Sequence, residues 1–168
     1  MDDNSTEFSL CTFNILAPCY KRMSGSRESS MPNLWVPRIH AILKFLLLHK
    51  PTVIAIQEFW FDYQFYQEFV EPISRYYYVY TVQRPSSPDG VALLVKKSSS
   101  LTVVGYAPLY YMDVGRRVAL MLHVCTSPSC GHGGGSSERT SLEDMATFNR
   151  DRDWRLDALG LPYIYIYL

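Results

Sequence analysis

The sequence predicts a mixed α/β domain in which helices cover one face of a sheet. Two observations predict this class. Residues 12–58 run in the order strand, loop, helix and strand, which is typical of a βαβ unit. Four strand candidates, at 76–82, 91–95, 101–106 and 117–124, then follow one another without an intervening helix, as antiparallel pairs do. Parallel strands in the βαβ unit and antiparallel pairs after it together give a mixed sheet.

Composition narrows the classes of function. The 168 residues are 48% hydrophobic, which suits one domain with a real core. Sixteen basic and sixteen acidic residues cancel, so no overall field favours nucleic acid or an anionic membrane. The longest apolar run near the helix candidate, residues 45–48, is too short to span a bilayer, and the acidic start is unlike a signal peptide. With four sparse cysteines, we expect a cytoplasmic or nuclear protein without a membrane partner.

Two strand ends carry the candidate site. The first strand, 12–16, holds Asn14 in its middle and stops at Ala17-Pro18. The second is a β-branched apolar run from residue 51 that ends in Gln57 and Glu58. If these strands are neighbours, Asn14 and Glu58 face one crevice at the carboxyl ends, where open sheets bind ligands. A carboxylate at that place favours a metal ion.

Prolines set the predicted helix boundaries. Residues 19–33 lack an apolar period and are expected to form a loop. Pro37 is expected in the first turn of a helix that ends at Lys50, before Pro51. A second helix is expected over residues 62–71, closed by Pro72.

The character of the chain changes near Cys125. Residues 84–90 are rich in turn formers and join the strands 76–82 and 91–95 into a hairpin. From Cys125 to Ser137 glycine and serine dominate, so we expect a domain over 8–124 and a divergent, poorly packed tail over 125–168. The last seven residues alternate like a strand, which would be an open edge unless it finds a sheet.

Three segments carry a resemblance to a known family. They are residues 12–18 (Thr-Phe-Asn-Ile-Leu-Ala-Pro), 50–58 (Lys-Pro-Thr-Val-Ile-Ala-Ile-Gln-Glu) and 89–96 (Asp-Gly-Val-Ala-Leu-Leu-Val-Lys). In this order they resemble successive signatures of the endonuclease/exonuclease/phosphatase superfamily, and the first is most similar to the deadenylase and nocturnin branch. The resemblance covers residues 8–124. It implies a four-layer α/β/β/α sandwich, present here as a truncated amino-terminal half, mainly one mixed sheet with helices on one face.

The resemblance also implies a chemistry. It is that of a Mg²⁺- or Mn²⁺-dependent phosphodiester hydrolase, such as a nuclease or 3′-exoribonuclease of the deadenylase type, acting on RNA or another phosphodiester. Glu58 would be the metal ligand and Asn14 would orient it or contact the phosphate, so both count as catalytic. Asp89 is a candidate substrate-binding residue, although Asp89-Gly90 is equally explained as turn chemistry.

Motifs that the family places later are absent. No Thr-His-Leu-like, Gly-Asp-Phe-Asn-like or final Asp-His run occurs in the sequence. We therefore expect this chain to be an inactive, truncated form. The alternative, from another class, is a non-catalytic fragment or isoform with a binding or regulatory role.

Three further patterns have simpler explanations. The Arg116-Arg117 pair suits phosphate but is more typical of a solvated strand flank. Cys125, Cys130 and His132 suggest zinc but lack a fourth ligand, and the glycines favour a flexible segment. The tyrosines of residues 76–80 are suited to base stacking, yet a half-buried strand explains them as well.

Overall fold

The first sheet contains both predicted site strands. The structure is a computed structural model, which describes residues 8–23, 25–111, 114–126 and 163–167. Four strands form this sheet in the order β1-β4-β6-β5, and β1 runs parallel to β4 while the other pairs are antiparallel. Their bounds are β1 (Leu10–Asn14), β4 (Val53–Trp60), β5 (Tyr77–Gln83) and β6 (Asp89–Lys96). The predicted mixed sheet and its βαβ opening are confirmed.

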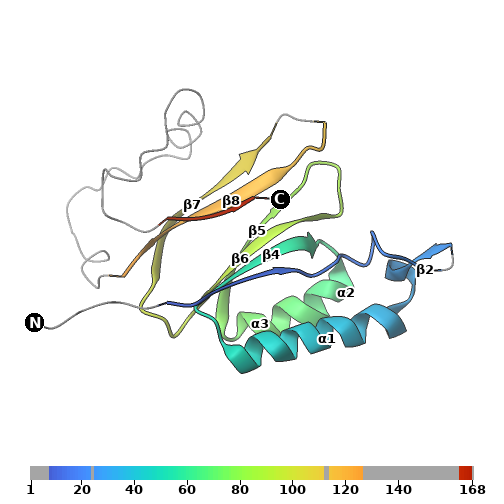
Figure 1. The fold of residues 1–168 in the computed structure, drawn as a ribbon, viewed down its shortest axis with the longest axis horizontal. Helices are drawn as coiled ribbons and strands as arrows, with labels where there is room; N and C mark the ends of the chain where they lie inside the picture. The colour runs from blue at the N-terminus through green and yellow to red at the C-terminus, as the bar shows by residue number, and fades with distance from the viewer. Residues whose placement is uncertain (1–7, 24, 112–113, 127–162, 168) are drawn as a thin grey trace, which may run out of the picture.

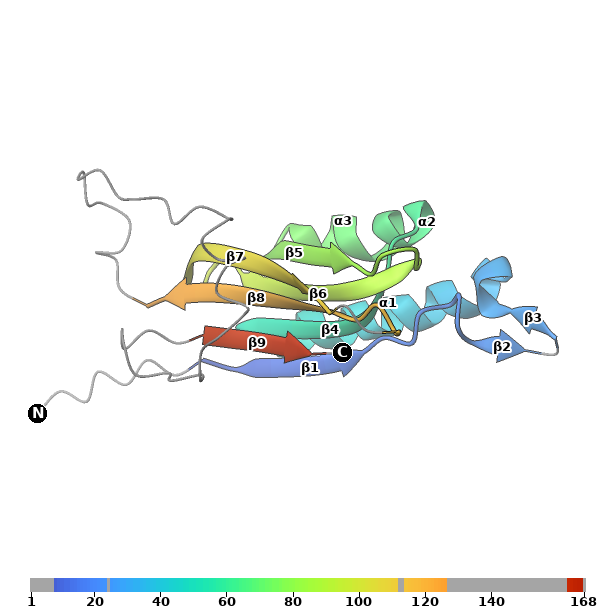
Figure 2. The same cartoon turned by 90° about the horizontal axis from the view of Figure 1, so that it is seen from above.

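A second sheet packs on the first. It consists of β7 (Thr102–Tyr110), β8 (Val118–Cys125) and β9 (Tyr163–Tyr167), all antiparallel, in the order β7-β8-β9. Figures 1 and 2 show it as a separate layer over the first sheet. The predicted final strand therefore exists, and β8 covers one of its edges. A small ribbon, β2 (Arg22–Met23) with β3 (Ser26–Arg27), lies in the loop after β1, followed by the short helix η1 (Glu28–Ser30).

The first helix begins earlier than predicted. Helix α1 (Pro32–His49) has Pro32 in its first turn, so the expectation that Pro37 opens the helix is wrong. Pro37 lies inside it, where a proline removes one backbone hydrogen bond. Burial of Trp35 and Ile39 on either side of Pro37 offsets that loss. The predicted end is confirmed, because Lys50 adopts a left-handed φ of 49° and its N–H bonds the Leu46 carbonyl.

The second helical segment is also longer than predicted. It comprises α2 (Tyr63–Phe65), a π-helical turn η2 (Tyr66–Val70) and α3 (Glu71–Ser74). Asp62 caps it, since its Oδ1 accepts hydrogen bonds from the backbone of Gln64 at 2.9 Å and of Phe65 at 3.2 Å. Pro72 does not close the segment, because a proline fits the first turn of α3 and the apolar face continues to buried Ile73.

Two apolar layers lie on the two faces of β4. Ile54 and Ile56 pack with the helices α1, α2 and α3, which cover one face of the first sheet (Figure 1). Val53 and Ala55 point the other way and pack against the second sheet. Burial on both faces explains the continuous apolar run by which this strand was predicted. The described residues thus form three layers, helices, sheet and sheet, of the expected sandwich.

Several expectations concern residues outside the described part of the chain. The predicted poor packing of the tail concerns mainly residues 127–137, and the zinc alternative requires Cys130 and His132. The domain boundary near 125 likewise stays a prediction. Among the described residues, no helix is both long and apolar enough to cross a membrane.

Candidate active site

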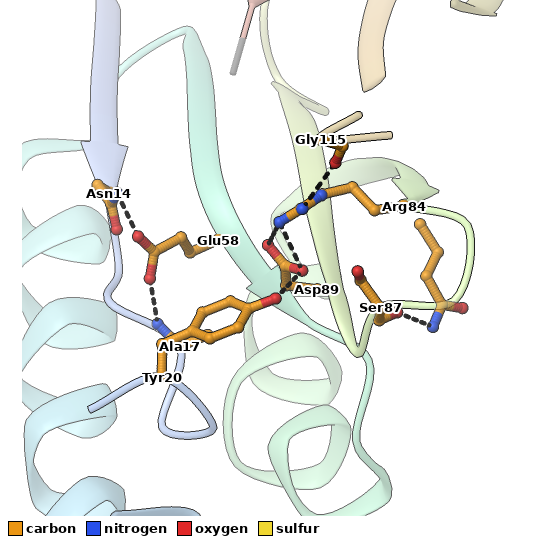
Figure 3. Close-up of polar contacts among 9 residues, drawn as sticks. Asn14, Ala17, Tyr20, Glu58, Arg84, Ser87, Asp89 and Gly115 are labelled. Atoms are coloured by element: carbon orange, nitrogen blue, oxygen red, sulfur yellow. Dashed lines mark hydrogen bonds and ion pairs between the residues drawn. The ribbon is translucent and has the colours of Figure 1, made fainter. Parts of the chain in front are cut away.

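The two strand ends meet as predicted. Asn14 is the last residue of β1 and lies opposite Gln57 in the parallel register. Its side-chain Nδ2 donates a hydrogen bond of 2.9 Å to Oε1 of Glu58 (Figure 3). The expected convergence of Asn14 and Glu58 is therefore confirmed, while their roles in chemistry are not yet tested.

A β-bulge presents Glu58. The sequence predicted that this strand ends at Glu58, which is wrong. Strand β4 continues to Trp60, past a shift in register between Gln57 and Phe59. In a regular strand residue 58 would follow Ile56 onto the face covered by the helices. The bulge lets Phe59 take that buried place and leaves Glu58 without a strand partner, with φ at 54°. This left-handed conformation is unfavourable for glutamate, and strain of this kind is typical of functional positions.

The turn after β1 completes the carboxylate's setting. The Ala17 N–H donates to Oε2 of Glu58 at 2.9 Å, so each carboxylate oxygen accepts one protein hydrogen bond. The Leu16 N–H donates to Oδ1 of Asn14 at 2.8 Å. Because that oxygen faces a donor, the amide group must turn its NH₂ towards Glu58. The carboxylate is thus fixed in orientation and retains lone pairs for a further ligand.

An ion-pair cluster around the buried carboxylate of Glu28 holds this turn. Arg38 of α1 donates to the carbonyl of Ile15 at 2.6 Å and pairs with Glu28, which also accepts from Lys21 at 2.9 Å. Burial alone would raise the pKa of Glu28, but the hydrogen bonds from the two cations outweigh it and hold that pKa below its usual value. A charged Glu28 therefore anchors Arg38, which in turn fixes the backbone next to Ala17.

Asp89 lies across from Glu58 at the start of β6. It is 1% exposed, and its Oδ1 accepts a 2.5 Å hydrogen bond from the Tyr20 hydroxyl. The Arg84 Nη1 lies 3.2 Å from each of its oxygens. Burial and the hydrogen bond to Asp89 raise the pKa of Tyr20 to about 12, so this hydroxyl stays protonated at neutral pH. Asp89 is at the site, as predicted, but its oxygens face protein donors (Figure 3).

Arg84 links the two sheets across the site. It follows β5, and its Nη2 donates at 2.9 Å to the carbonyl of Gly115, in the connection between β7 and β8. A cavity of about 400 Å³ opens between these groups. Its lining comprises the three predicted site residues and four others: Asn14, Glu58, Asp89, Tyr20, Arg84, Gly115 and Arg117.

Sequence reasoning missed three of these side chains. Arg84 and Asp89 flank a predicted hairpin turn with opposite charges, which is a signal that they pair. Tyr20 lies in a loop without any pattern, so only its neighbourhood to the first motif pointed to it. Arg117 was interpreted as solvated; it lines the cavity, whereas Arg116 donates to Ser86 Oγ at 2.8 Å and is not part of the lining.

The donor set fits a hard cation with few protein ligands. Within the described ranges no group of three or more His, Cys, Asp or Glu side chains surrounds one point. Mg²⁺ needs no such cage, because one or two carboxylates hold it while water and substrate oxygens fill the other positions. A fixed Glu58 carboxylate beside an open cavity meets that requirement. Asp89 is the less accessible carboxylate, because it is 1% exposed and its oxygens already accept hydrogen bonds from Tyr20 and Arg84.

Comparison with known proteins identifies the family. The model of the Endonuclease/Exonuclease/phosphatase family matches residues 11–161. The chain belongs to this family. An uncharacterized calcium-binding protein of Arabidopsis thaliana is 37% identical over 134 residues, which is 72% of this chain and 26% of that protein. The chain thus spans about a quarter of this relative.

Solved structures of the family share the fold. ANGEL2, a 2′,3′-cyclic phosphatase, superposes with a TM-score of 0.54 and 22% identity over 70% of this chain and 36% of its own. The human Nocturnin catalytic domain with a bound sulfate has a TM-score of 0.53 and 20% identity, over 70% of this chain and 43% of its own. TDP2 from C. elegans has a TM-score of 0.54 and 15% identity, over 71% of this chain and 32% of its own. The chain therefore spans less than half of each of these structures.

Proposed function

We propose that this chain carries the metal-binding part of a Mg²⁺-dependent phosphodiester hydrolase site, with RNA as the substrate class and a cytoplasmic or nuclear place of action. One observation carries the proposal: a bulge in β4 presents the Glu58 carboxylate, with both oxygens oriented by Asn14 and Ala17, to a cavity of about 400 Å³. Family membership supports the same chemistry. Deadenylase-type specificity is the finer part of this proposal and rests on the motif at residues 12–18.

Each residue has a defined task in this proposal. Glu58 would hold the ion. Asn14 and the Ala17 N–H keep its carboxylate in one orientation, so the side chain loses less conformational entropy when the ion binds. A bound Mg²⁺ supplies polarisation of a phosphoryl oxygen and neutralises charge that develops there. The cavity has the size of a small-ligand pocket, sufficient to admit a phosphate group and part of its nucleoside.

Metal binding by the purified chain tests the proposal. Mn²⁺, followed by electron paramagnetic resonance, replaces Mg²⁺ as the probe. Ca²⁺ is the competing ion, because the Arabidopsis relative is named as a calcium-binding protein. Glu58→Gln should weaken Mn²⁺ binding at least about tenfold, as expected when a carboxylate ligand is lost. Glu68→Gln is the matched control, because Glu68 pairs with His40 on the surface and is not in the lining of the cavity. Equal Mn²⁺ affinity in the two variants would refute the proposal.

The alternative, a binding function without turnover, is favoured by one feature of the cavity. Among the described residues that line it there is no histidine, the oxygens of Asp89 accept from Tyr20 and Arg84, and the Tyr20 hydroxyl is protonated at neutral pH. With Glu58 assigned to the metal ion, no other described lining side chain is a ready general base for water. We propose that the chain binds metal and phosphate without appreciable hydrolysis.

A further inference from the structure

We infer that Arg84 contacts a phosphoryl oxygen of the substrate, and that buried Asp89 and the Tyr20 hydroxyl position its guanidinium for this contact. The inference deepens the proposed function and rests on it for the identity of the substrate as a phosphate ester. It also assigns Asp89 a different task from the direct substrate contact expected from the sequence.

The hydrogen bonds of Arg84 leave donors for a ligand. Nη1 serves the two oxygens of Asp89, and Nη2 serves the carbonyl of Gly115. Each terminal nitrogen of a guanidinium carries two N–H groups. The two oxygens of Asp89, both 3.2 Å from Nη1, lie in nearly the same direction and share one of these groups, so one N–H on each terminal nitrogen remains. The side chain of Arg84 is 25% exposed and belongs to the cavity lining, so these donors have a place to act. Two N–H groups on one planar fork suit two oxygens of a phosphoryl group.

The setting of Asp89 is that of a positioning residue. Its carboxylate is 1% exposed and accepts from Tyr20 at 2.5 Å and from Arg84 at 3.2 Å, so its oxygens face protein donors at the cavity wall. An ion pair with a buried carboxylate is a costly way to fix the β5–β6 hairpin, because apolar side chains achieve the same without removing charges from water. A cation held rigidly at a cavity wall by a buried anion is what recognition of an anionic group requires.

The position of Arg84 complements that of Glu58. Both side chains line one cavity from different strands, Glu58 from the bulge of β4 and Arg84 from the end of β5 (Figure 3). A phosphate ester has several anionic oxygens, so a metal ion at Glu58 and a guanidinium at Arg84 are able to bind different oxygens of the same group. Charge-assisted hydrogen bonds of this kind contribute more than neutral ones.

The test measures binding of inorganic phosphate to the chain without metal, by calorimetry at constant ionic strength. Arg84→Gln should weaken binding about tenfold, as expected for loss of a charge-assisted pair. Arg116→Gln is the matched control: it removes the same charge nearby, but Arg116 bonds Ser86 and is not in the lining of the cavity. If the two variants bind phosphate with equal affinity, whether unchanged or weakened relative to the parent chain, the inference is overturned.

Two further variants separate positioning from charge. Tyr20→Phe keeps Arg84 and every charge, yet removes a donor to Asp89, so phosphate binding should weaken about threefold. Arg84→Lys keeps the charge without the fork and should lie between the parent chain and Arg84→Gln. If Arg84→Gln does not fold, Tyr20→Phe decides, and unchanged affinity in it overturns the inference.

The Mn²⁺ titration distinguishes this inference from the proposed function. Arg84→Gln should leave Mn²⁺ affinity within about twofold of the parent, because Arg84 contacts neither Glu58 nor Asn14 in the structure. Loss of metal binding only in Glu58→Gln, with loss of phosphate binding only in Arg84→Gln, supports both statements. Phosphate binding that depends on Arg84 in a chain that binds no metal would refute the proposed function and leave the anion site standing.

Discussion

Glu58 and Asp89 lie in one cavity, yet their surroundings give them different tasks. Glu58 is only partly buried and accepts an amide N–H₂ and a backbone N–H, both neutral donors, so its charge is available to a cation. Asp89 is buried and its charge is compensated by Arg84. The sequence shows two carboxylates near strand ends; only the partners determine which one faces a ligand.

The pKa of Tyr20 leads to a prediction about stability at high pH. Its pKa of about 12 in the folded chain lies above the ordinary tyrosine value of 10.0, because burial and the hydrogen bond to Asp89 favour the neutral phenol. A raised pKa in the folded state contributes stability that is complete below about pH 10 and is lost as pH rises from there towards about 12. The difference in free energy of unfolding between the parent chain and Tyr20→Phe should therefore shrink over this range.

Urea unfolding of both proteins as a function of pH measures this difference. The pKa values of Tyr77 and Tyr80 are also raised by burial, but these residues are present in both proteins, so their effect cancels. Tyr63→Phe is a suitable control, because Tyr63 is 78% exposed and lies outside the cavity lining. A difference for Tyr20→Phe that stays constant up to pH 12 would show that its hydroxyl is not held by Asp89.

The bulge in β4 is the element that creates the site. Beside it, β6 approaches β5 closely: a Cβ on Gly90 would lie 2.0 Å from the carbonyl oxygen of Val82 on β5. Gly90 pairs with both Phe59 and Gln83, so it lies next to the bulge and in the centre of the sheet. The Asp89-Gly90 motif thus serves strand packing and Arg84 positioning at once, rather than only a turn.

Strain at the bulge predicts an unusual order of stability. At φ 54° an alanine is strained by about 1 kcal/mol, whereas glycine adopts this conformation freely. Glu58→Gly should therefore be more stable than Glu58→Ala by about 1 kcal/mol in urea unfolding, although both lose the same hydrogen bonds.

The neighbouring position provides the control. Gln57 lies in the same strand without positive φ, so there the usual order should hold, with the glycine variant less stable than the alanine variant by about 0.5 kcal/mol or more. The same order of stability at both positions would argue against a strained Glu58.

Periodicity predicted the elements better than their ends. Apolar runs gave β4 and β6, and the hairpin of β5 with β6 and the antiparallel pair of β7 with β8 were expected, whereas the β2–β3 ribbon lies where a loop was expected. The start of α1 was misplaced because Pro37 and Pro32 both suit a first turn, and only the burial of Trp35 shows that the helix includes the earlier turn. The bulge at Glu58 has no local sequence signal, because it depends on the pairing of β4 with β6.

At the scale of the molecule, the motifs predicted the family and the layers, but not how the sheets divide. Strands β7 and β8 were expected as an antiparallel pair, and the structure places them in a second sheet that covers Val53, Ala55 and Leu93. Which strands leave the first sheet depends on long-range packing, which periodicity does not encode. The hydrogen bond between Arg84 and Gly115 depends on that packing, so the sequence did not predict it either.

The two sheets together set the last prediction, which concerns turnover. Hydrolysis requires a positioned base for the attacking water, commonly worth about 10²–10⁴-fold in rate, in addition to a metal ion. The described lining of the cavity between the sheets presents Glu58, Arg84 and Arg117 but no histidine. The oxygens of Asp89 face Tyr20 and Arg84, and Tyr20, with a pKa of about 12, keeps its proton at neutral pH. The purified chain with Mg²⁺ or Mn²⁺ should therefore show no turnover above background on RNA, single-stranded DNA or a generic phosphodiester. Turnover that is present in the parent chain and lost in Glu58→Gln, but kept in Glu68→Gln, would show that the described residues, or the rest of the chain, supply the base after all.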